Sequence, residues 1–167
     1  MSGAPLPRGT VTFLFSDIEA STDLVRRVGD DVFAAIRGDH RRLLRDAFAE
    51  RGGREIDTAG DGFFASFDGP ARAVQAATTI TGALGEAGIP IRAGVHTGEC
   101  EVSEDKLAGI AVSIAARIAS VATSGEVLVS STVKDLVAGS GIAFEDRGEH
   151  VLKGVPDSWR LYAAGPL

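Results

Sequence analysis

The apolar and polar positions of this chain follow two periods that change along its length. Residues 11–18, VTFLFSDI, form a short continuous apolar run with β-branched and aromatic members, which is typical of a strand buried on both faces. Over residues 30–50 the apolar positions instead recur at helical spacing. These positions are Val32, Phe33, Ile36, His40, Leu43, Leu44, Ala47 and Phe48. The pattern predicts a central strand, a short helix from about Ser21 and a longer helix over 30–50.

Glycine and proline divide the next part of the chain into further elements. The Gly52–Gly53 pair ends the long helix, and residues 54–67 have the turn-centred pattern of a β-hairpin. Pro70 opens an alanine-rich helix that reaches about Ala87, since the first helical turn tolerates proline. A further strand is predicted over 89–98.

The second half of the chain continues this alternation. Residues 107–122 predict a helix with small residues over much of its surface, 126–130 a short strand, and 142–154 and 158–164 edge strands. The order β-α-α-β-β-α-β-α-β, completed by the edge strands, is typical of an α+β sandwich in which helices pack on one mostly antiparallel sheet. The chain shows neither an internal repeat nor a linker, so a single domain is expected.

Composition narrows the class of protein. A chain of 167 residues with 44% hydrophobic and 24% charged residues is able to bury a full core. The net charge of -6 argues against nucleic acid and anionic membranes as partners. The single cysteine, Cys100, excludes an internal disulfide and fits a reducing compartment. No apolar run approaches the ~20 residues that span a bilayer, and residues 1–9 lack a hydrophobic leader, so we expect a cytoplasmic protein.

Two aspartates carry candidate metal chemistry. Asp17 ends the first apolar strand, where an isolated carboxylate is costly unless it is solvated, paired or metal-bound. Asp61 lies at the tip of the predicted hairpin, and if the hairpin neighbours the first strand the two carboxylates converge as hard ligands for Mg²⁺, Mn²⁺ or Ca²⁺. Free N–H groups at the helix start near Ser21 and Thr22 would form an adjacent anion site. Alternatively, Asp17 is a helix N-cap and Asp61 a turn former.

Five segments taken together resemble a known family. They are FSDIEASTDL, TAGDGFFASF, AGVHTGE, LAGIAVSIAARIASVATSGEVLVS and HVLKGV. In this order they are similar to the class III nucleotidyl cyclase catalytic domain in its compact bacterial form. The resemblance runs over residues 10–163 and leaves 1–9 and 164–167 as tails. It implies a ferredoxin-like sheet covered by helices, in agreement with the element order above.

The resemblance also implies an activity and partners. Cyclases of this family convert a nucleoside triphosphate into the 3′,5′-cyclic nucleotide and pyrophosphate, using two divalent metals, and Ca²⁺ would be a non-productive substitute for Mg²⁺ or Mn²⁺. Two domains pair head to tail, and each active site is built across their interface. For this chain the resemblance implies a homodimer that binds ATP or GTP, with ATP the first expectation.

Roles can be carried over residue by residue. Asp17 and Asp61 match the two metal-binding aspartates, and the backbone carbonyl of Ile18 matches a further metal ligand. Arg117 matches the arginine that stabilises the transition state from the partner protomer, and Lys153 resembles the lysine that contacts the terminal phosphates. On the residues alone, both cations could equally be solvated surface side chains. The substrate-binding turn and its neighbourhood comprise Ile18, Glu19, Ala20, Ser21, Thr22 and Gly60.

Three positions depart from the family's pattern. Asp57 stands where adenylyl cyclases carry a lysine that reads adenine N1. Lys106, next to Asp105, stands where they carry an aspartate that accepts from the adenine amino group. Ser113 replaces the asparagine that contributes a hydrogen bond to the transition state. The base-reading pair therefore has its charges exchanged, and one catalytic hydrogen bonder is shortened.

The exchanged charges leave three interpretations open. Asp57 and Lys106 read adenine with their roles reversed, or they read guanine, with the carboxylate accepting from N1–H and N2–H₂ and the ammonium donating to O6. In the third interpretation they pair with each other across the dimer and hold the base poorly. The chain is accordingly a cyclase with relaxed specificity or weak activity, or a degenerate module that binds nucleotide or only dimerises. The intact Asp17, Asp61 and Arg117 favour the enzyme.

Overall fold

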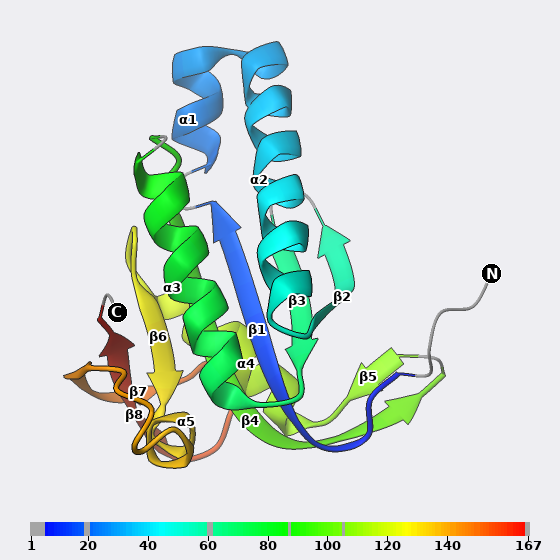
Figure 1. Cartoon of the computed structure of the whole chain (residues 1–167), viewed down its shortest axis with the longest axis vertical. Coiled ribbons are helices and arrows are strands. Elements are labelled where there is room, and N and C mark those ends of the chain that lie inside the picture. The colour runs from blue at the N-terminus through cyan, green and yellow to red at the C-terminus, as the bar shows by residue number, and fades with distance from the viewer. Residues whose placement is uncertain (1–5, 19–20, 60–61, 87, 105, 166–167) are drawn as a thin grey trace.

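The computed structural model describes residues 6–18, 21–59, 62–86, 88–104 and 106–165 (Figure 1). Its centre is a sheet in the strand order β2-β3-β1-β4-β6-β8-β7, with β5 paired to β4. The strands are β1 (Gly9–Ile18), β2 (Gly53–Ala59), β3 (Gly62–Phe67), β4 (Ile91–Ser103), β5 (Lys106–Ala108), β6 (Val127–Ser130), β7 (Phe144–Val151) and β8 (Ser158–Ala164). β4 and β6 run parallel, and every other pairing of the described strands is antiparallel. The predicted mostly antiparallel α+β sheet is confirmed.

Helices cover both faces of this sheet. Figure 1 shows α2 and α3 in front of the strands and α4 behind them. The helices are α1 (Ser21–Val28), α2 (Asp30–Glu50), α3 (Pro70–Glu86), α4 (Ile110–Val121) and α5 (Ser131–Leu136). The helices expected from Ser21, over 30–50, from Pro70 and over 107–122 are confirmed, although the last begins at Ile110 because the residues before it belong to β5 and to a turn.

Two features were not predicted from the sequence. β4 continues past its expected end at residue 98 and is followed by β5, which pairs back on it after a turn in which Glu104 has a φ of 51°. α5 follows β6 directly, and the Ser130 side chain caps it by accepting from the Val133 N–H. Both β5 and α5 are too short to show a periodic pattern of apolar positions.

The first strand is buried on both faces, as its continuous apolar run predicts. Leu14 and Ile18 belong to the core cluster shared with α1, α2 and α3, whereas Val11 and Phe13 belong to the cluster shared with α4. Side chains alternate along a strand, so Asp17 falls on the same face as Phe13. The strand thus delivers a carboxylate at its end to the side of the sheet that α4 covers.

Helix α4 lies close to β4 because glycine and alanine meet where the two elements cross. A Cβ built on Gly94 would stand 2.3 Å from the backbone N of Ala119 and 2.9 Å from the carbonyl O of Ala115. One built on Gly98 would stand 2.7 Å from the Cβ of Ala111. No larger side chain fits in that space, so the helix backbone itself rests on the strand and fixes where its outer residues lie.

Candidate functional site

Asp17, the first predicted metal ligand, lies at the end of β1 directly opposite Arg92 of β4. Arg92 Nε donates to Asp17 Oδ1 at 2.8 Å, and Arg92 Nη2 donates to Asp17 Oδ2 at 3.4 Å. The Asp17 side chain is 34% exposed and that of Arg92 is 25% exposed. The two-point contact therefore orients both oxygens of a carboxylate that solvent and small ions still reach.

Arg92 also contacts the end of α4. Its Nη1 donates to the carbonyl O of Ser120 at 3.0 Å and to the carbonyl O of Ala122 at 3.4 Å. The last carbonyls of a helix lack helical partners and carry the negative end of the helix dipole, so a guanidinium stabilises them. One side chain thus joins the Asp17 carboxylate to the end of α4. Sequence reasoning missed this residue, because the contact depends on the pairing of strands 75 positions apart.

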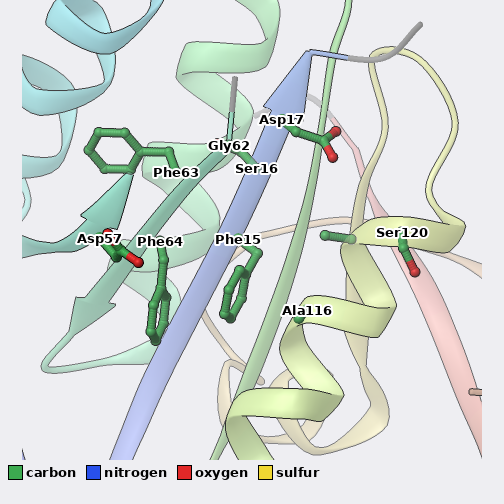
Figure 2. Close-up of a pocket in the computed structure, with 10 residues that line it drawn as sticks. Phe15, Ser16, Asp17, Asp57, Gly62, Phe63, Phe64, Ala116 and Ser120 are labelled. Carbon is green, nitrogen blue, oxygen red and sulfur yellow. The ribbon is translucent and has the colours of Figure 1, made fainter. Parts of the chain in front are cut away.

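A cavity of about 220 Å³ opens beside Asp17. It is lined by Phe15, Ser16, Asp17, Asp57, Gly62, Phe63, Phe64, Ala116, Ala119 and Ser120. Figure 2 shows the rings of Phe15 and Phe64 side by side between Asp57 and helix α4. These rings are stacked, with centroids 4.2 Å apart and an interplanar angle of 9°. The cavity therefore combines an apolar aromatic surface with two carboxylates.

The hairpin that leads to Asp61 lies next to β1, as the metal-site prediction requires. β3 pairs antiparallel with β1, and Phe63 stands opposite Ser16. Gly62, which follows Asp61 in the chain, lines the cavity beside Asp17. The neighbourhood of the two segments is confirmed, while the convergence of the two carboxylates stays a prediction because Asp61 lies outside the described residues.

The described part of the site offers hard oxygen donors to a divalent cation. The Asp17 carboxylate is partly exposed, and the Ile18 backbone follows it at the end of β1. Oxygen ligands of this kind fit Mg²⁺ and Mn²⁺. Within the described ranges, no group of three or more His, Cys, Asp or Glu side chains is placed to hold a metal ion. Outside those ranges lie Glu19, Ala20, Gly60 and Asp61, together with the side chains of Ser21 and Thr22.

A second cavity, of about 350 Å³, brings the two predicted base-reading residues together. It is lined by Leu6, Ile56, Asp57, Phe64, Lys106 and Leu107. Asp57 and Phe64 line both cavities, so the two spaces adjoin. Among the described residues no ion pair or hydrogen bond joins Asp57 to Lys106. Opposite charges of one chain therefore face a common space. Leu6 also lines this space, and sequence analysis did not identify it.

A β-bulge turns Asp57 toward this space. β2 and β3 pair in register up to Glu55, and after a register shift Asp57 pairs with Phe64. The shift makes Ile56 the extra residue of the bulge, a device by which strands re-aim side chains beside functional sites. Glu55, in contrast, does not line this space and pairs with a residue of α2. It binds Arg45 of α2 at 2.6 Å, and this hydrogen bond lowers the pKa of Glu55.

The outer face of α4 carries the predicted Ser113 and Arg117. Both are exposed and lie one helical turn apart, opposite the alanines that rest on β4. The Arg117 guanidinium forms no ion pair or hydrogen bond with any other described residue, while its backbone carbonyl accepts from Ser120 Oγ at 2.7 Å. Within the described part of the chain, the Arg117 guanidinium is thus unpaired, and it stands on a helix whose backbone rests on β4.

Lys153 lies in the connection between β7 and β8, next to α4. Its neighbours Leu152 and Val155 are buried in one cluster with Ile114 and Ile118 of that helix. Lys153 itself is exposed and makes no ion pair with the rest of the described chain. The packing of its neighbours thus places Lys153, a second cation without an acidic partner among the described residues, beside the helix that carries Arg117.

His96, in the AGVHTGE segment, is a buried polar residue of β4. Its Nδ1 lies 2.7 Å from Ser130 Oγ, and its ring packs edge-on against Trp159 with centroids 5.6 Å apart. Burial lowers the pKa of His96 to about 4, because desolvation disfavours the imidazolium. The ring is neutral at pH 7 and supports the packing of the sheet instead of supplying a charge.

Similarity to known proteins covers nearly the whole chain. Residues 5–163 match a family profile described as "Adenylate and Guanylate cyclase catalytic domain". The uncharacterized protein Rv0891c of Mycobacterium tuberculosis (strain ATCC 25618 / H37Rv) is 33% identical over 167 residues, which cover 96% of this chain and 58% of that protein. This chain therefore spans less than two thirds of the length of that curated relative.

Solved structures share the fold. The adenylyl cyclase CyaB from P. aeruginosa superposes with a TM-score of 0.85 at 20% identity, covering 96% of each chain. The guanylate cyclase domain of RhGC from Catenaria anguillulae, solved in complex with GTP, has a TM-score of 0.82 at 22% identity, covering 95% of this chain and 97% of that one. An adenylyl and a guanylate cyclase thus share this architecture. In the described part of the chain, no helix combines the length and apolarity that a membrane crossing requires.

Proposed function

This chain belongs to the adenylate and guanylate cyclase catalytic domains of class III, and on that basis we propose that it converts a purine nucleoside triphosphate into the 3′,5′-cyclic nucleotide and pyrophosphate as a homodimer. The observation that carries the proposal is the pair of adjoining cavities. One contains Asp17 at the end of β1, and the other is faced by Asp57 and Lys106. A triphosphate with its metals and a purine need two such neighbouring compartments.

Divalent cations would be held by the carboxylates of Asp17 and Asp61 and by the Ile18 carbonyl. When bound, Mg²⁺ or Mn²⁺ lowers the pKa of the ribose 3′-hydroxyl and neutralises charge on the phosphates. The chain's own part is to orient the first carboxylate. Arg92 positions it through two hydrogen bonds to Asp17, and a bound cation would have to share or displace these contacts.

The free cations serve the charge that develops on the phosphates. Arg117 and Lys153 have no acidic partner among the described residues. Arg117 lies on α4, and close packing on Gly94 fixes the distance of this helix from the sheet. A cation without a counter-ion can stabilise new negative charge without first breaking an ion pair. In the proposed homodimer, Arg117 and Lys153 of one protomer act on the substrate whose metals the other protomer holds.

The base lies between Asp57 and Lys106 in this proposal. Guanine fits the two charges in the family's orientation, because its N1–H and N2–H₂ face the carboxylate and its O6 faces the ammonium. Adenine requires the crossed arrangement, with the ammonium on N1 and the carboxylate on the amino group. Restoring the family's charges with Asp57→Lys and Lys106→Asp is expected to raise the yield of cyclic AMP relative to cyclic GMP, measured by chromatography. An unchanged product ratio would show that these positions do not read the base.

The direct test is cyclase activity with a matched pair of aspartate variants. The protein is incubated with Mn²⁺ and either ATP or GTP, and the cyclic nucleotide and pyrophosphate are quantified. Asp17→Ala is expected to abolish product, whereas Asp23→Ala, a change at an exposed residue of α1, leaves it unchanged. Product that survives Asp17→Ala would remove the metal assignment.

A second candidate function is a cyclase-like module that binds nucleotide or dimerises without turnover. Ser113 favours it, because its hydroxyl is shorter than an amide and offers one donor. Absence of product from both nucleotides, combined with saturable binding of ATP or GTP in calorimetry, would establish this alternative.

A further inference from the structure

Arg92 makes contacts in two directions, and each is specific in geometry. On one side Nε and Nη2 hold the two carboxylate oxygens of Asp17 at 2.8 and 3.4 Å. On the other side Nη1 holds the carbonyls of Ser120 and Ala122 at 3.0 and 3.4 Å. The planar guanidinium is suited to span both sets of acceptors, since its donors form a rigid fork.

A divalent cation at Asp17 competes with this guanidinium for the same two oxygens. Both species are positive, so they also repel each other across a distance of a few ångströms. As the carboxylate turns toward the cation and the cation repels the guanidinium, Arg92 is displaced, and its rigid fork loses part of its hold on the carbonyls at the end of α4. Occupancy at Asp17 therefore changes the contacts that cap the helix.

We propose that Arg92 is a positioning residue that couples cation binding at Asp17 to the last turn of α4, and thereby to Arg117. The inference rests on the proposed function, in which Asp17 holds a metal and Arg117 acts on the substrate. Ser120, whose carbonyl Arg92 caps, also donates its hydroxyl to the Arg117 carbonyl at 2.7 Å. The response is confined to Ser120 and the residues after it, because Gly94 packs against the backbone of Ala119, and it reaches Arg117 through the Ser120 hydroxyl.

The coupling has a consequence for the proposed homodimer. Within one protomer, Asp17 serves one active site and Arg117 serves the other. Arg92 links the two through a single side chain, so cation binding at the first site is felt by the catalytic arginine of the second. Coupling of this kind is reciprocal, and typical values change affinity five- to 150-fold in other proteins.

Two substitutions separate the roles of charge and of shape. Arg92→Gln removes the positive charge and most of the fork, and is expected to tighten Mn²⁺ binding about fivefold because the competitor is gone. Arg92→Lys keeps the charge but not the fork, so Mn²⁺ affinity is expected to stay within about twofold of the unaltered chain. Arg160→Gln removes an equally charged residue from an exposed pair with Asp146 and is the control. Mn²⁺ affinity is measured by electron paramagnetic resonance, with Asp17→Ala as the variant that lacks the site.

Amide hydrogen exchange over residues 118–122 measures how cation binding at Asp17 changes the stability of the end of α4. In the unaltered chain, saturating Mn²⁺ is expected to speed exchange there severalfold, since the helix end loses part of its cap. Arg92→Gln and Arg92→Lys are expected to exchange fast at the outset and to show no further change with Mn²⁺. Circular dichroism confirms that both variants keep their secondary structure. A merely structural role would weaken Mn²⁺ binding in both variants, the opposite of the expected pattern.

The outcomes distinguish this inference from the proposed function. Neither measurement uses turnover, so the coupling is decided even if no cyclic nucleotide is formed. Unchanged exchange in a chain that binds Mn²⁺ through Asp17, or weaker Mn²⁺ binding in Arg92→Gln, overturns the coupling and leaves the cyclase assignment intact. If Asp17→Ala and the unaltered chain bind Mn²⁺ equally, the metal assignment fails, and the coupling is overturned with it.

Discussion

The two faces of α4 differ in almost every physical respect. The inner face carries Ala111, Ala115 and Ala119 and rests so closely on β4 that a Cβ on Gly94 would meet helix backbone at 2.3 Å. The outer face carries the exposed Ser113 and Arg117, and the guanidinium makes no hydrogen bond or ion pair with the rest of the described chain. The inner face is fully packed within the chain, whereas the outer face leaves its polar side chains exposed.

This difference separates what the helix contributes to stability from what it contributes to chemistry. Close backbone packing makes the inner face intolerant of added volume. It also places the outer side chains on a support that does not move when they are replaced. Substitutions on the inner face should therefore destabilise the fold. Substitutions on the outer face should lower activity and leave the fold intact.

The largest effect is expected at Gly94. Gly94→Ala adds a methyl group against the backbone of Ala119 and Ala115, which cannot withdraw without lifting the helix. The free energy of unfolding in urea is expected to fall by about 3 kcal/mol or more. Gly82→Ala in α3, where the added Cβ meets nothing within 4 Å, is the matched control and is expected to raise stability by up to ~1 kcal/mol. Equal stability of Gly94→Ala and the unaltered chain would contradict the close packing.

The outer face gives the reverse pattern at Arg117. Arg117→Ala is expected to leave the free energy of unfolding within ~0.5 kcal/mol and to lower cyclase activity by roughly 10²–10³. If the sites are shared between protomers, an equal mixture of Arg117→Ala and Asp17→Ala chains regains about a quarter of full activity, because half of the dimers are mixed and each mixed dimer has one intact site. No recovery after subunit exchange would argue against sites built across the dimer.

His96 lies in β4 between Gly94 and Gly98, and its protonation tests how well the inner face of α4 is shielded from solvent. Its pKa is lowered by burial from 6.5 to about 4, so the unfolded chain binds a proton over this range that the folded chain does not. Stability from this group is present above pH 6.5 and is lost as the pH falls toward 4, by up to about 3 kcal/mol. The imidazole resonances in NMR should titrate near pH 4, and His96→Asn should flatten the fall in urea stability. A midpoint near 6.5 would show that the ring is not shielded.

The smallest effect is expected at Ser113. Ser113→Asn restores a longer side chain with an amide donor on the exposed face of α4, at a position with no packing to disturb. Cyclase activity is expected to rise roughly tenfold, less than the full effect of restoring an oxyanion donor, because a serine hydroxyl is itself able to donate one hydrogen bond. Unfolding in urea should be unchanged. Unaltered kcat in this variant would place the catalytic shortfall elsewhere.

Sequence patterns predicted the parts of the fold that repeat over many residues. The apolar run of β1 and the helical spacing over 30–50 each contain enough positions to define a period. α5, with six residues, and β5, with three, do not. The expected end of β4 at residue 98 was wrong because its last part, up to Ser103, has the polar composition of a loop and is held as a strand by pairing with β5.

The sequence predicted candidate residues for the site, but not the contacts that these residues make. Asp57 and Lys106 were identified one by one from motif positions, whereas their common cavity follows from the folding of β2 and β5 toward the same side of the sheet. The role of Arg92 was not predictable from the sequence, because it depends on the β1–β4 register, which places Arg92 opposite Asp17. Asp61 lies outside the described residues, and its role stays a prediction.

The positions of Asp57 and Lys106 bear on how this domain can evolve. β2 is the outermost strand at one end of the sheet, and β5 pairs with β4 alone, so both residues stand on peripheral strands with few packing obligations. Substitutions there can reverse charge without disturbing the central strands. If these residues read the base as proposed, nucleobase preference could change by substitutions that leave the close packing of α4 on β4 intact.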